Sequence, residues 1–207
     1  MIKINAIIYK PLLSNTYVVH DEASKEAFIV DPGGQVEAIV KVMEAEKIIP
    51  KFILYTHLHL DHIAGGLQAS EHFQIPSYAN ESDLYLFESL EQTSMFLQIP
   101  QVSPPVIDGN FGLDDELEIG DTIIKVIHTP GHTPGGTCFL VDNHLFTGDT
   151  LFKESIGRTD LWGGDYKAIM KSIKEKIFIL PDSIEIHPGH GEYSTIGYEK
   201  RNNPHIR

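Results

Sequence analysis

The chain of 207 residues has very little cysteine, no long apolar run and few basic side chains for its length. Its one cysteine, Cys138, excludes an internal disulfide and a cysteine-based zinc finger, so we expect a cytoplasmic, reducing setting. No apolar run approaches the roughly 18 residues that a transmembrane helix needs. The N-terminal residues alternate like a strand and lack the small-residue cleavage site of a signal peptide.

The shortage of basic residues also restricts the partners that the chain can bind. Lysine and arginine total 16 against 29 aspartates and glutamates, which gives a formal net charge of −13. Such a chain repels phosphate backbones and anionic lipid. We therefore expect no nucleic-acid partner and no membrane partner, and the search for function turns to small-molecule chemistry. The oligomeric state cannot be read from the sequence.

The hydrophobic content of 42% is typical of a folded protein with one substantial core. Patterning predicts strands at 2–9, 14–20, 27–31, 51–55, 117–128, 136–142, 144–148 and 183–187, and helices at 35–46, 82–98 and 165–177. Strands and helices thus alternate in two blocks, which favours an α/β fold with two packed sheets and helices outside. We interpret residues 1–207 as a single domain, with the proline-rich stretch 100–105 as an internal loop.

A dense group of potential metal ligands follows the predicted strand 51–55, in the run Thr56-His57-Leu58-His59-Leu60-Asp61-His62. Imidazole and carboxylate are good ligands for zinc, iron and similar ions. Four such side chains within six residues cannot all reach one ion from a regular strand or helix. A turn could present His57 and His59 on one side and Asp61 and His62 on the other, which fits two adjacent ions. The alternative is a solvated polar loop, because short motifs give false positives.

Three further junctions place a potential ligand directly after a predicted strand and beside glycine. These are His132 in a Pro-Gly-His-Thr run, Asp149 in Thr-Gly-Asp-Thr and His190 in Pro-Gly-His-Gly. A fourth junction, Asp31-Pro32-Gly33-Gly34, carries a carboxylate without histidine. Glycine lets the backbone turn tightly and approach a site closely. A lone histidine in a loop is usually solvated, but the repetition of one pattern argues for a shared site.

In their order along the chain, Asp31, the His-Leu-His-Leu-Asp-His run, His132, Asp149 and His190 resemble the metallo-β-lactamase superfamily. The resemblance implies an αββα sandwich of two mixed β-sheets flanked by helices, with a dinuclear metal site along one edge. It implies a first ion held by His57, His59 and His132, a second held by Asp61, His62 and His190, and Asp149 bridging both. Asp31 would orient a ligand histidine. Two divalent ions are therefore expected, zinc first, with iron or manganese also suitable.

Segments around these ligands resemble the glyoxalase II (hydroxyacylglutathione hydrolase) branch in its short bacterial form. They are residues 148–152, 157–160 and 188–191 and the tail 194–204. The resemblance implies hydrolysis of thioesters such as S-lactoylglutathione by a metal-bridging hydroxide, with Asp61 and Asp149 as the catalytic carboxylates. Full-length members of that branch add a C-terminal helical domain that forms part of the glutathione pocket. Because this chain stops soon after Pro204, we expect its selectivity for glutathione to differ.

Arg158 falls where that branch places a basic residue near the glutathione moiety, so we assign it to substrate binding. The alternative is an ordinary surface arginine. Asn15 and Tyr17, expected in a loop at a strand edge, and Lys153 are weaker candidates for the same role.

Three other activities remain open. Persulfide dioxygenases are similar in the Gly-Arg-Thr-Asp segment, and the resemblance would give a single iron held by His57, His132 and Asp149. A lactonase would use the same site, because a metal hydroxide also attacks lactones. A ribonuclease-like member is disfavoured by the charge of −13. A protein that only stores metal is the least favoured reading, because structural sites are closed and need fewer ligands.

Overall fold

Two six-stranded β-sheets form the centre of the molecule. The computed structural model describes residues 1–34, 36–112 and 115–206. In order across the first sheet the strands are β1 (Ile2–Tyr9), β2 (Ser14–Asp21), β3 (Glu26–Val30), β4 (Ile49–Leu54), β5 (Ser77–Ala79) and β6 (Gly109–Asn110). Across the second sheet they are β14 (Ser194–Thr195), β13 (Glu185–Pro188), β10 (His144–Gly148), β9 (Thr137–Val141), β8 (Thr122–His128) and β7 (Glu116–Ile119). A small separate sheet pairs β11 (Leu151–Phe152) with β12 (Ser155–Ile156).

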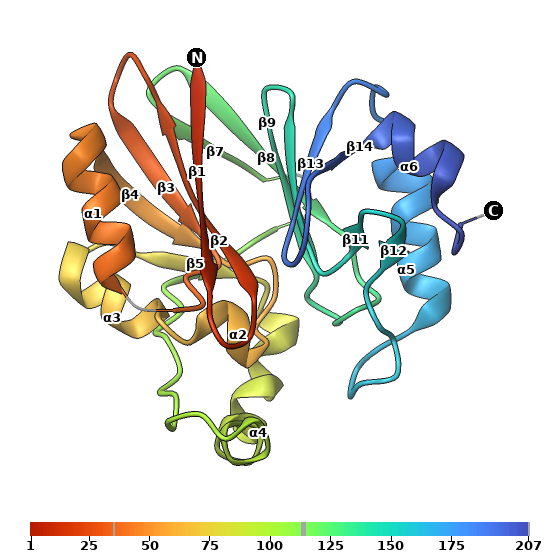
Figure 1. Ribbon diagram of the computed structural model, residues 1–207, viewed down its shortest axis with the longest axis horizontal. Coiled ribbons are helices and arrows are strands. Elements are labelled where there is room, and N and C mark those ends of the chain that lie inside the picture. The colour runs from red at the N-terminus through yellow and green to blue at the C-terminus, as the bar shows by residue number, and fades with distance from the viewer. Residues whose placement is uncertain (35, 113–114, 207) are drawn as a thin grey trace.

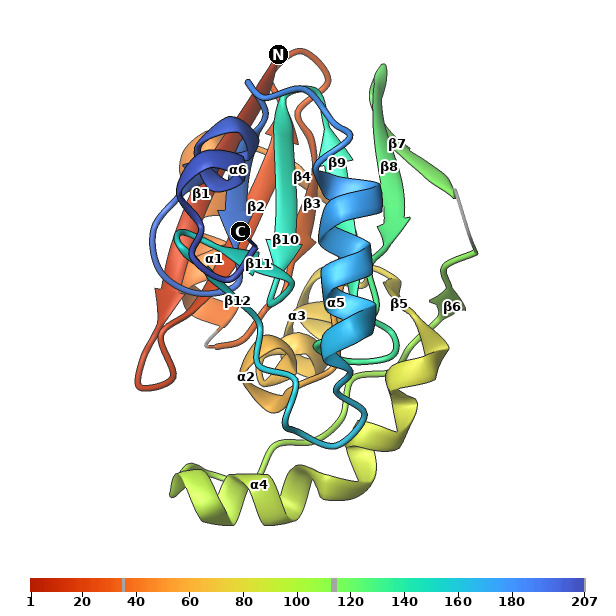
Figure 2. The same cartoon turned by 90° about the vertical axis from the view of Figure 1, so that its right-hand side faces the viewer.

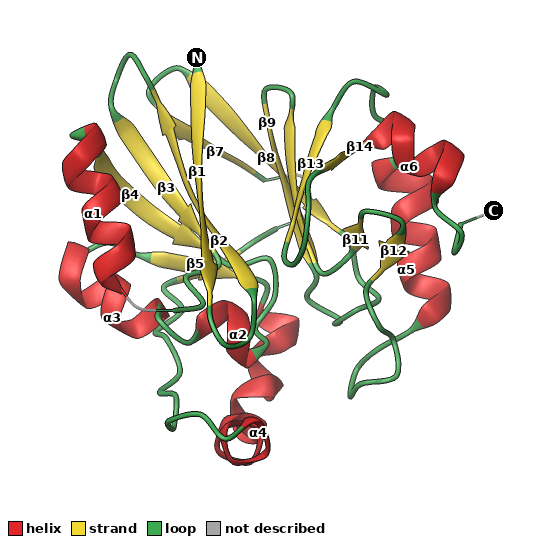
Figure 3. Ribbon diagram, in the orientation of Figure 1, coloured by secondary structure: helices red, strands yellow, loops and turns green. Residues whose placement is uncertain are grey.

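Helices cover the outer face of each sheet (Figures 1 and 3). The helices are α1 (Val36–Glu46), α2 (Leu60–Ile63), α3 (Gly66–Phe73), a 3-10 helix (Glu81–Ser89), α4 (Leu90–Leu97), α5 (Tyr166–Ser172), a π-helical turn (Ile173–Ile177) and α6 (Ile196–Asn202). α1 and α3 lie against the first sheet, and α5 and α6 lie on the far side of the second (Figures 1 and 2). No helix in the described residues is long and apolar enough to cross a membrane.

Both sheets are mixed, so the predicted αββα fold class is confirmed. In the first sheet β1, β2 and β3 are antiparallel, whereas β3, β4, β5 and β6 run parallel. In the second sheet β10 and β13 are parallel and the other named pairs are antiparallel. The apolar strand β4 shows why this sandwich forms. Its Phe52 and Leu54 pack into the core between the sheets, while Ile53 packs beneath the helices of the first layer.

Three predicted elements differ in detail from the structure. The strand predicted at 117–128 is a hairpin of β7 and β8, because Gly120 adopts a φ of +53° and reverses the chain. The helix predicted at 82–98 begins as a 3-10 helix and becomes regular only at Leu90. The helix predicted at 35–46 corresponds to α1, and its first residue, Gln35, lies outside the described residues, as does Arg207 at the end of the predicted domain.

The strands that precede the candidate ligands end at one edge of the sandwich, at the bottom of Figure 1 beside α2. They are β4, β8, β10 and β13, which end at Leu54, His128, Gly148 and Pro188. β8 and β10 both run antiparallel to β9, and β13 runs parallel to β10, so their last residues reach the same edge of the second sheet. The loops that follow bring together residues far apart in the sequence.

His187 is a buried ring on β13 that packs between the sheets. It stacks on Phe146 with ring centroids 5.0 Å apart and contacts the edge of Tyr17 at 5.7 Å. Its Nε2 lies 3.0 Å from Nδ1 of His144, and its Nδ1 has no hydrogen-bond partner among the described residues. Burial, together with the nearby His144, lowers the pKa of His187 to about 3. The folded protein therefore holds this imidazole neutral.

We expect His187→Phe to make the protein less sensitive to acid. Below the ordinary histidine pKa of 6.5 the unfolded chain binds a proton that the folded chain refuses until about pH 3. Stability from this residue is thus present above pH 6.5 and is lost as the pH falls, by about 1.4 kcal/mol per pH unit. Urea unfolding at pH 7 and pH 4, with chelator present, should show a pH dependence in the variant that is smaller by roughly 3 kcal/mol.

The exposed His72→Gln provides the control, because it removes one imidazole from the surface and leaves the core between the sheets unchanged. If the free energy of unfolding of His187→Phe depends on pH as strongly as that of the wild type, His187 is not held neutral in the folded protein.

Candidate metal centre

Two groups of side chains at the edge of the sandwich have the composition and spacing of metal sites. The ligand atoms within each group lie within 4.8 Å of one another. The groups are His57, His59 and His132, and Asp61, His62 and His190. The short helix α2 separates them, because His57 and His59 precede it while Asp61 and His62 lie in its single turn. This is the division that a turn in the 57–62 run predicts.

Asp149 lies between the two groups. Its Oδ1 is 3.4 Å from Nε2 of His62, and its Oδ2 is 3.5 Å from Nε2 of His132 and 3.7 Å from Nε2 of His190. On the other side of the second group, Asp61 Oδ2 is 3.0 Å from Nε2 of His190. One carboxylate therefore contacts members of both groups, which is the position of a bridging ligand.

The ring orientation of four histidines is determined by contacts at Nδ1. His57 contacts the Thr56 hydroxyl at 3.1 Å and His62 contacts Asp31 at 2.9 Å. His132 contacts the carbonyl oxygen of Arg158 at 2.8 Å, and His190 that of Leu13 at 3.1 Å. Such contacts place the proton on Nδ1 and leave Nε2 as the ligand atom. His59 differs, since its Nδ1 lies 2.9 Å from Nε2 of His132.

Unsatisfied buried atoms show that the residues fit metal ions. His57 Nε2, His62 Nε2 and Asp149 Oδ1 are buried without a hydrogen-bond partner among the described residues. Buried polar atoms of this kind normally have one. Two ligands that each lie about 2.1 Å from a tetrahedral ion are about 3.4 Å apart, close to the 3.4 Å and 3.5 Å between Asp149 and its histidines. Imidazole with carboxylate suits zinc, iron and manganese.

The pKa shifts leave most of these groups in the form that binds metal. Burial lowers the pKa of His57 well below its usual value and that of His59 to about 4, so both rings are neutral. Burial acts to raise the pKa of Asp61 and Asp149, but the surrounding histidines, His62 foremost, together outweigh it, so both pKa values are lowered and both groups are ionised. Burial alone would lower the pKa of His62, but the carboxylates of Asp61 and Asp149 hold this pKa well above its usual value. Metal must therefore displace a proton from His62.

Asp31 supports the site from beneath. Its carboxylate accepts hydrogen bonds from the backbone N–H and hydroxyl of Thr56 at 2.7 Å and 2.6 Å, and it contacts His62 as the resemblance implied. Asp31 has a φ of +48°, a left-handed conformation that aspartate tolerates better than most residues. The turn after β3 thus places one carboxylate against His62 of the second ligand group and against Thr56, whose hydroxyl contacts His57 of the first.

Asn15 and Tyr17 lie within the strand predicted at 14–20 and not in a loop at its edge. Both are buried within β2, which runs alongside the segment that carries His190. The Asn15 amide donates to the carbonyls of Pro188 and Gly191 at 3.0 Å and 3.1 Å, and the Tyr17 hydroxyl donates to Pro188 at 2.7 Å. These residues hold the His190 loop against the first sheet and are not available to a substrate.

Glycine is required where this loop passes the centre. A Cβ on Gly189 would lie 2.3 Å from Oδ1 of Asp149 and 2.7 Å from Cε1 of His62. Both distances are below any real carbon contact, so a side chain at this position would displace a candidate ligand. The glycine beside His190 therefore permits close backbone approach, as the sequence suggested.

Asp83 is a residue that the sequence did not single out. It is 1% exposed in the 3-10 helix, and burial raises the pKa of its carboxyl group. It accepts hydrogen bonds from Gly135 N–H at 2.6 Å, the Thr133 hydroxyl at 2.8 Å and Leu58 N–H at 3.4 Å. These donors belong to two different ligand-bearing loops. Asp83 therefore ties together the loops of His57, His59 and His132.

A cavity of about 290 Å³ opens beside the ligand groups, lined by His59, Asp61, His132 and Asp149 and by residues of the 3-10 helix and α4. Arg158 lines it too, but the guanidinium is 62% exposed and pairs with both oxygens of Asp160 at 2.8 Å. Lys153 does not line it and pairs with Glu192.

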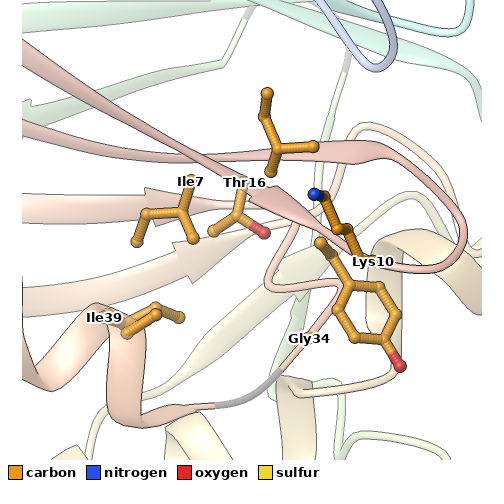
Figure 4. A pocket seen from close by; sticks show the side chains of 8 residues that line it. Ile7, Lys10, Thr16, Gly34 and Ile39 are labelled. Atoms are coloured by element: carbon orange, nitrogen blue, oxygen red, sulfur yellow. The ribbon is translucent and has the colours of Figure 1, made fainter.

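A second cavity, of about 260 Å³, lies between β1, β2 and α1. Figure 4 shows its lining side chains, among them Ile7, Lys10, Thr16 and Ile39. None of the residues that line it is a candidate metal ligand. Two further ligand-like groups occur: Asp31, His57 and His62, which shares its histidines with the groups at the centre, and His144, Glu185 and His187, at the opposite end of β10 and β13. The cavity beside Asp149 is therefore the candidate functional site.

The layered fold and the paired ligand groups define a metal-binding αββα protein. The chain belongs to the metallo-beta-lactamase superfamily, whose model matches residues 9–195, and members of this superfamily are metal-dependent hydrolases.

Among its relatives, the chain is 39% identical over 196 residues to hydroxyacylglutathione hydrolase GloC of Haemophilus influenzae, covering 93% of this chain and 92% of that protein. The crystal structure of BLEG-1 B3 metallo-beta-lactamase has a TM-score of 0.90 and 37% identity, covering 100% of this chain and 99% of the other. TTHA1623 in a di-iron-bound form has a TM-score of 0.84 and 32% identity, covering 97% and 98%.

Proposed function

We propose that the protein is a dinuclear metal-dependent hydrolase of thioesters of the S-lactoylglutathione type. In this proposal His57, His59 and His132 hold one divalent ion, Asp61, His62 and His190 hold a second, and Asp149 bridges the two. The position of Asp149 between the ligand groups carries the proposal, because its two oxygens lie 3.4 to 3.7 Å from three histidines of the two groups. The similarity to TTHA1623, solved in a di-iron-bound form, supports two ions.

Two bound divalent ions supply a water nucleophile at neutral pH and positive charge for the oxygen of the carbonyl under attack. The protein's own residues supply the rest. Asp61 and Asp149 offset part of the metal charge and are ionised, while the Nδ1 contacts hold the histidines in the ligand orientation. The cavity beside Asp149 provides space for a substrate next to the ligand groups. No serine or cysteine nucleophile is needed, and Cys138 is buried in the core.

The choice of a thioester rests on the relative GloC, a hydroxyacylglutathione hydrolase 39% identical to this chain. We propose zinc as the metal, with iron and manganese as alternatives that the same ligands accept. We also propose that residues 1–207 act as one domain, because the first sheet supplies Asp31 and the 57–62 run while the second supplies His132, Asp149 and His190. The Arg158 guanidinium remains our candidate for substrate contact at the cavity.

The completeness of the second ligand group argues against a single-iron dioxygenase. Such an enzyme would need His57, His132 and Asp149 alone, and Asp61, His62 and His190 would have no role. Here Asp61 Oδ2 lies 3.0 Å from His190, and the His62 Nε2 atom is buried without a partner among the described residues. A lactonase and a β-lactamase would use the same centre, the latter favoured by the similarity to BLEG-1.

We expect the protein, loaded with zinc under air, to release thiol from S-D-lactoylglutathione without consuming oxygen. Removing the metal with a chelator should lower this rate at least about a hundredfold, because the nucleophile depends on the ions. Parallel assays with glutathione persulfide, a lactone and a chromogenic β-lactam separate the alternatives. Oxygen uptake with persulfide and no thiol release would overturn the proposal in favour of the dioxygenase.

A further inference from the structure

The cavity beside the ligand groups is lined mainly by leucine side chains wherever the ligands do not form its wall. Leu58 and Leu60 of the ligand run contribute two of the seven, and the β1–β2 turn, the 3-10 helix, α4 and the segment 157–165 contribute the other five: Leu12, Leu86, Leu90, Leu97 and Leu161. Tyr85 and Trp162 join two of these walls, since the Tyr85 hydroxyl donates to the Trp162 carbonyl at 2.8 Å and the rings are 4.6 Å apart. α4 lies below the sandwich in Figure 2, so these walls project beyond the sheets.

Charge is nearly absent from this lining. Apart from the candidate ligands, Arg158 is the one charged side chain among the described residues that line the cavity, and Asp160 neutralises it through two hydrogen bonds of 2.8 Å. The other polar side chains are Ser89 and Thr93, and the Ser89 hydroxyl already donates to the carbonyl of Leu86. A charged substituent placed against these leucine-lined walls, away from the ligand groups, would lose its hydration without gaining a partner.

The volume restricts what enters. At about 30 Å³ for each water-sized group, a cavity of about 290 Å³ holds roughly ten non-hydrogen atoms. This is enough space for a carbonyl group with a short aliphatic chain. In the proposed orientation the acyl portion occupies the cavity, and the thiol portion extends outward past Arg158.

We propose that the cavity is an acyl-binding site and that the enzyme prefers thioesters of aliphatic acyl groups of about four to six carbons over lactoyl thioesters. This inference rests on the proposed thioester hydrolysis. Each methylene that moves from water into the leucine-lined cavity contributes binding energy, whereas the lactoyl hydroxyl must find one of few polar partners. The preference is thus a property of α4 and the segment 157–165 and not of the metal ligands.

The test compares glutathione thioesters with acetyl, lactoyl, butyryl and hexanoyl groups on the zinc-loaded protein. We expect kcat/KM to rise about fourfold per methylene, so that hexanoyl, with four more methylenes, exceeds acetyl by about 250-fold and butyryl exceeds lactoyl. Calorimetric binding of hexanoate and acetate, the carboxylate products, should follow the same order without turnover. Leu97→Gln and Leu161→Gln, at the exposed rim, should lower the hexanoyl-to-acetyl ratio about tenfold each.

Leu84→Gln is the matched control. Leu84 lies in the 3-10 helix that also carries the cavity residue Leu86, but it is 41% exposed and does not line the cavity. Its acyl preference should equal that of the wild type. Cleavage of lactoylglutathione with no dependence on chain length would overturn the acyl site and leave the thioesterase intact. Failure to cleave any thioester, with hexanoate still bound more tightly than acetate, would instead overturn the thioesterase and keep the apolar site.

Discussion

Replacing Asp149 by Asn is expected to reduce the bound metal from two ions to one or fewer per chain and to lower kcat/KM by about a thousandfold. Two divalent ions bring four positive charges, and Asp149, between the ligand groups, is with Asp61 one of two carboxylates that would offset them. The amide removes that charge and turns a donor toward His62 or His132, whose Nε2 atoms lie 3.4 Å and 3.5 Å from the carboxylate. Breaking a buried charged contact costs about 3–5 kcal/mol, which corresponds to two to four powers of ten.

Metal content after equilibrium dialysis and kcat/KM for S-lactoylglutathione measure the two effects. Asp121→Asn, in the exposed turn between β7 and β8, controls for the loss of one negative charge elsewhere in the chain. It should retain both ions and the wild-type rate. Two ions bound tightly by Asp149→Asn would contradict the bridging role, whatever the rate.

The fold was predictable because the pattern of apolar residues is local. The run of apolar residues in β4 predicts a strand buried on both faces, and the spacing of Ile39, Val40 and Met43 predicts α1. The hairpin at Gly120 was missed because apolar residues recur through both of its strands and one glycine is weak evidence for a turn. Propensity also cannot tell the 3-10 helix from α4, because both have apolar residues at similar spacing.

The ligands that lie close together in the sequence were easier to predict than those that come from distant strands. His57, His59, Asp61 and His62 fall within one turn of chain, so their division into two groups follows from spacing alone. His132, Asp149 and His190 come from other strands, and only their common position after a strand and beside glycine connects them. Asn15 and Tyr17 were the weaker candidates for substrate contact, and the structural role that they have was not predictable because their partners, Pro188 and Gly191, are more than 170 residues away in the sequence.

Asp83 shows where sequence reasoning ends. Nothing near it in the chain suggests a site, since it sits in an amphipathic helical stretch where an aspartate is ordinarily solvated. Its partners lie 25, 50 and 52 residues away, at Leu58, Thr133 and Gly135. Burial and three converging donors identify it only once the chain is folded, and they make it a positioning residue for the metal loops.

Asp83→Asn is therefore expected to weaken metal binding ten- to a hundredfold as well as stability, without touching a ligand. One end of the amide must point a donor at Gly135 N–H or at Leu58 N–H, leaving a buried donor unsatisfied at a cost of about 2 kcal/mol. For a chain of this length that lowers Tm by about 4–8 °C. Loss of a contact that positions the loops carrying the metal ligands lowers metal affinity ten- to a hundredfold. Competition with a chromophoric chelator and thermal unfolding measure the two effects.

Asp21→Asn separates the positioning role from ordinary packing. Asp21 is also buried and accepts hydrogen bonds from three groups, Ala23 N–H at 2.6 Å, Ser24 N–H at 2.9 Å and the Thr122 hydroxyl at 3.3 Å. It ends β2, at the edge of the sandwich opposite the ligands. Its replacement should lower Tm while metal affinity stays at the wild-type value. If the two variants bind metal with equal affinity, Asp83 only stabilises the fold. If Asp83→Asn alone loses metal affinity, Asp83 positions the loops that carry the metal ligands.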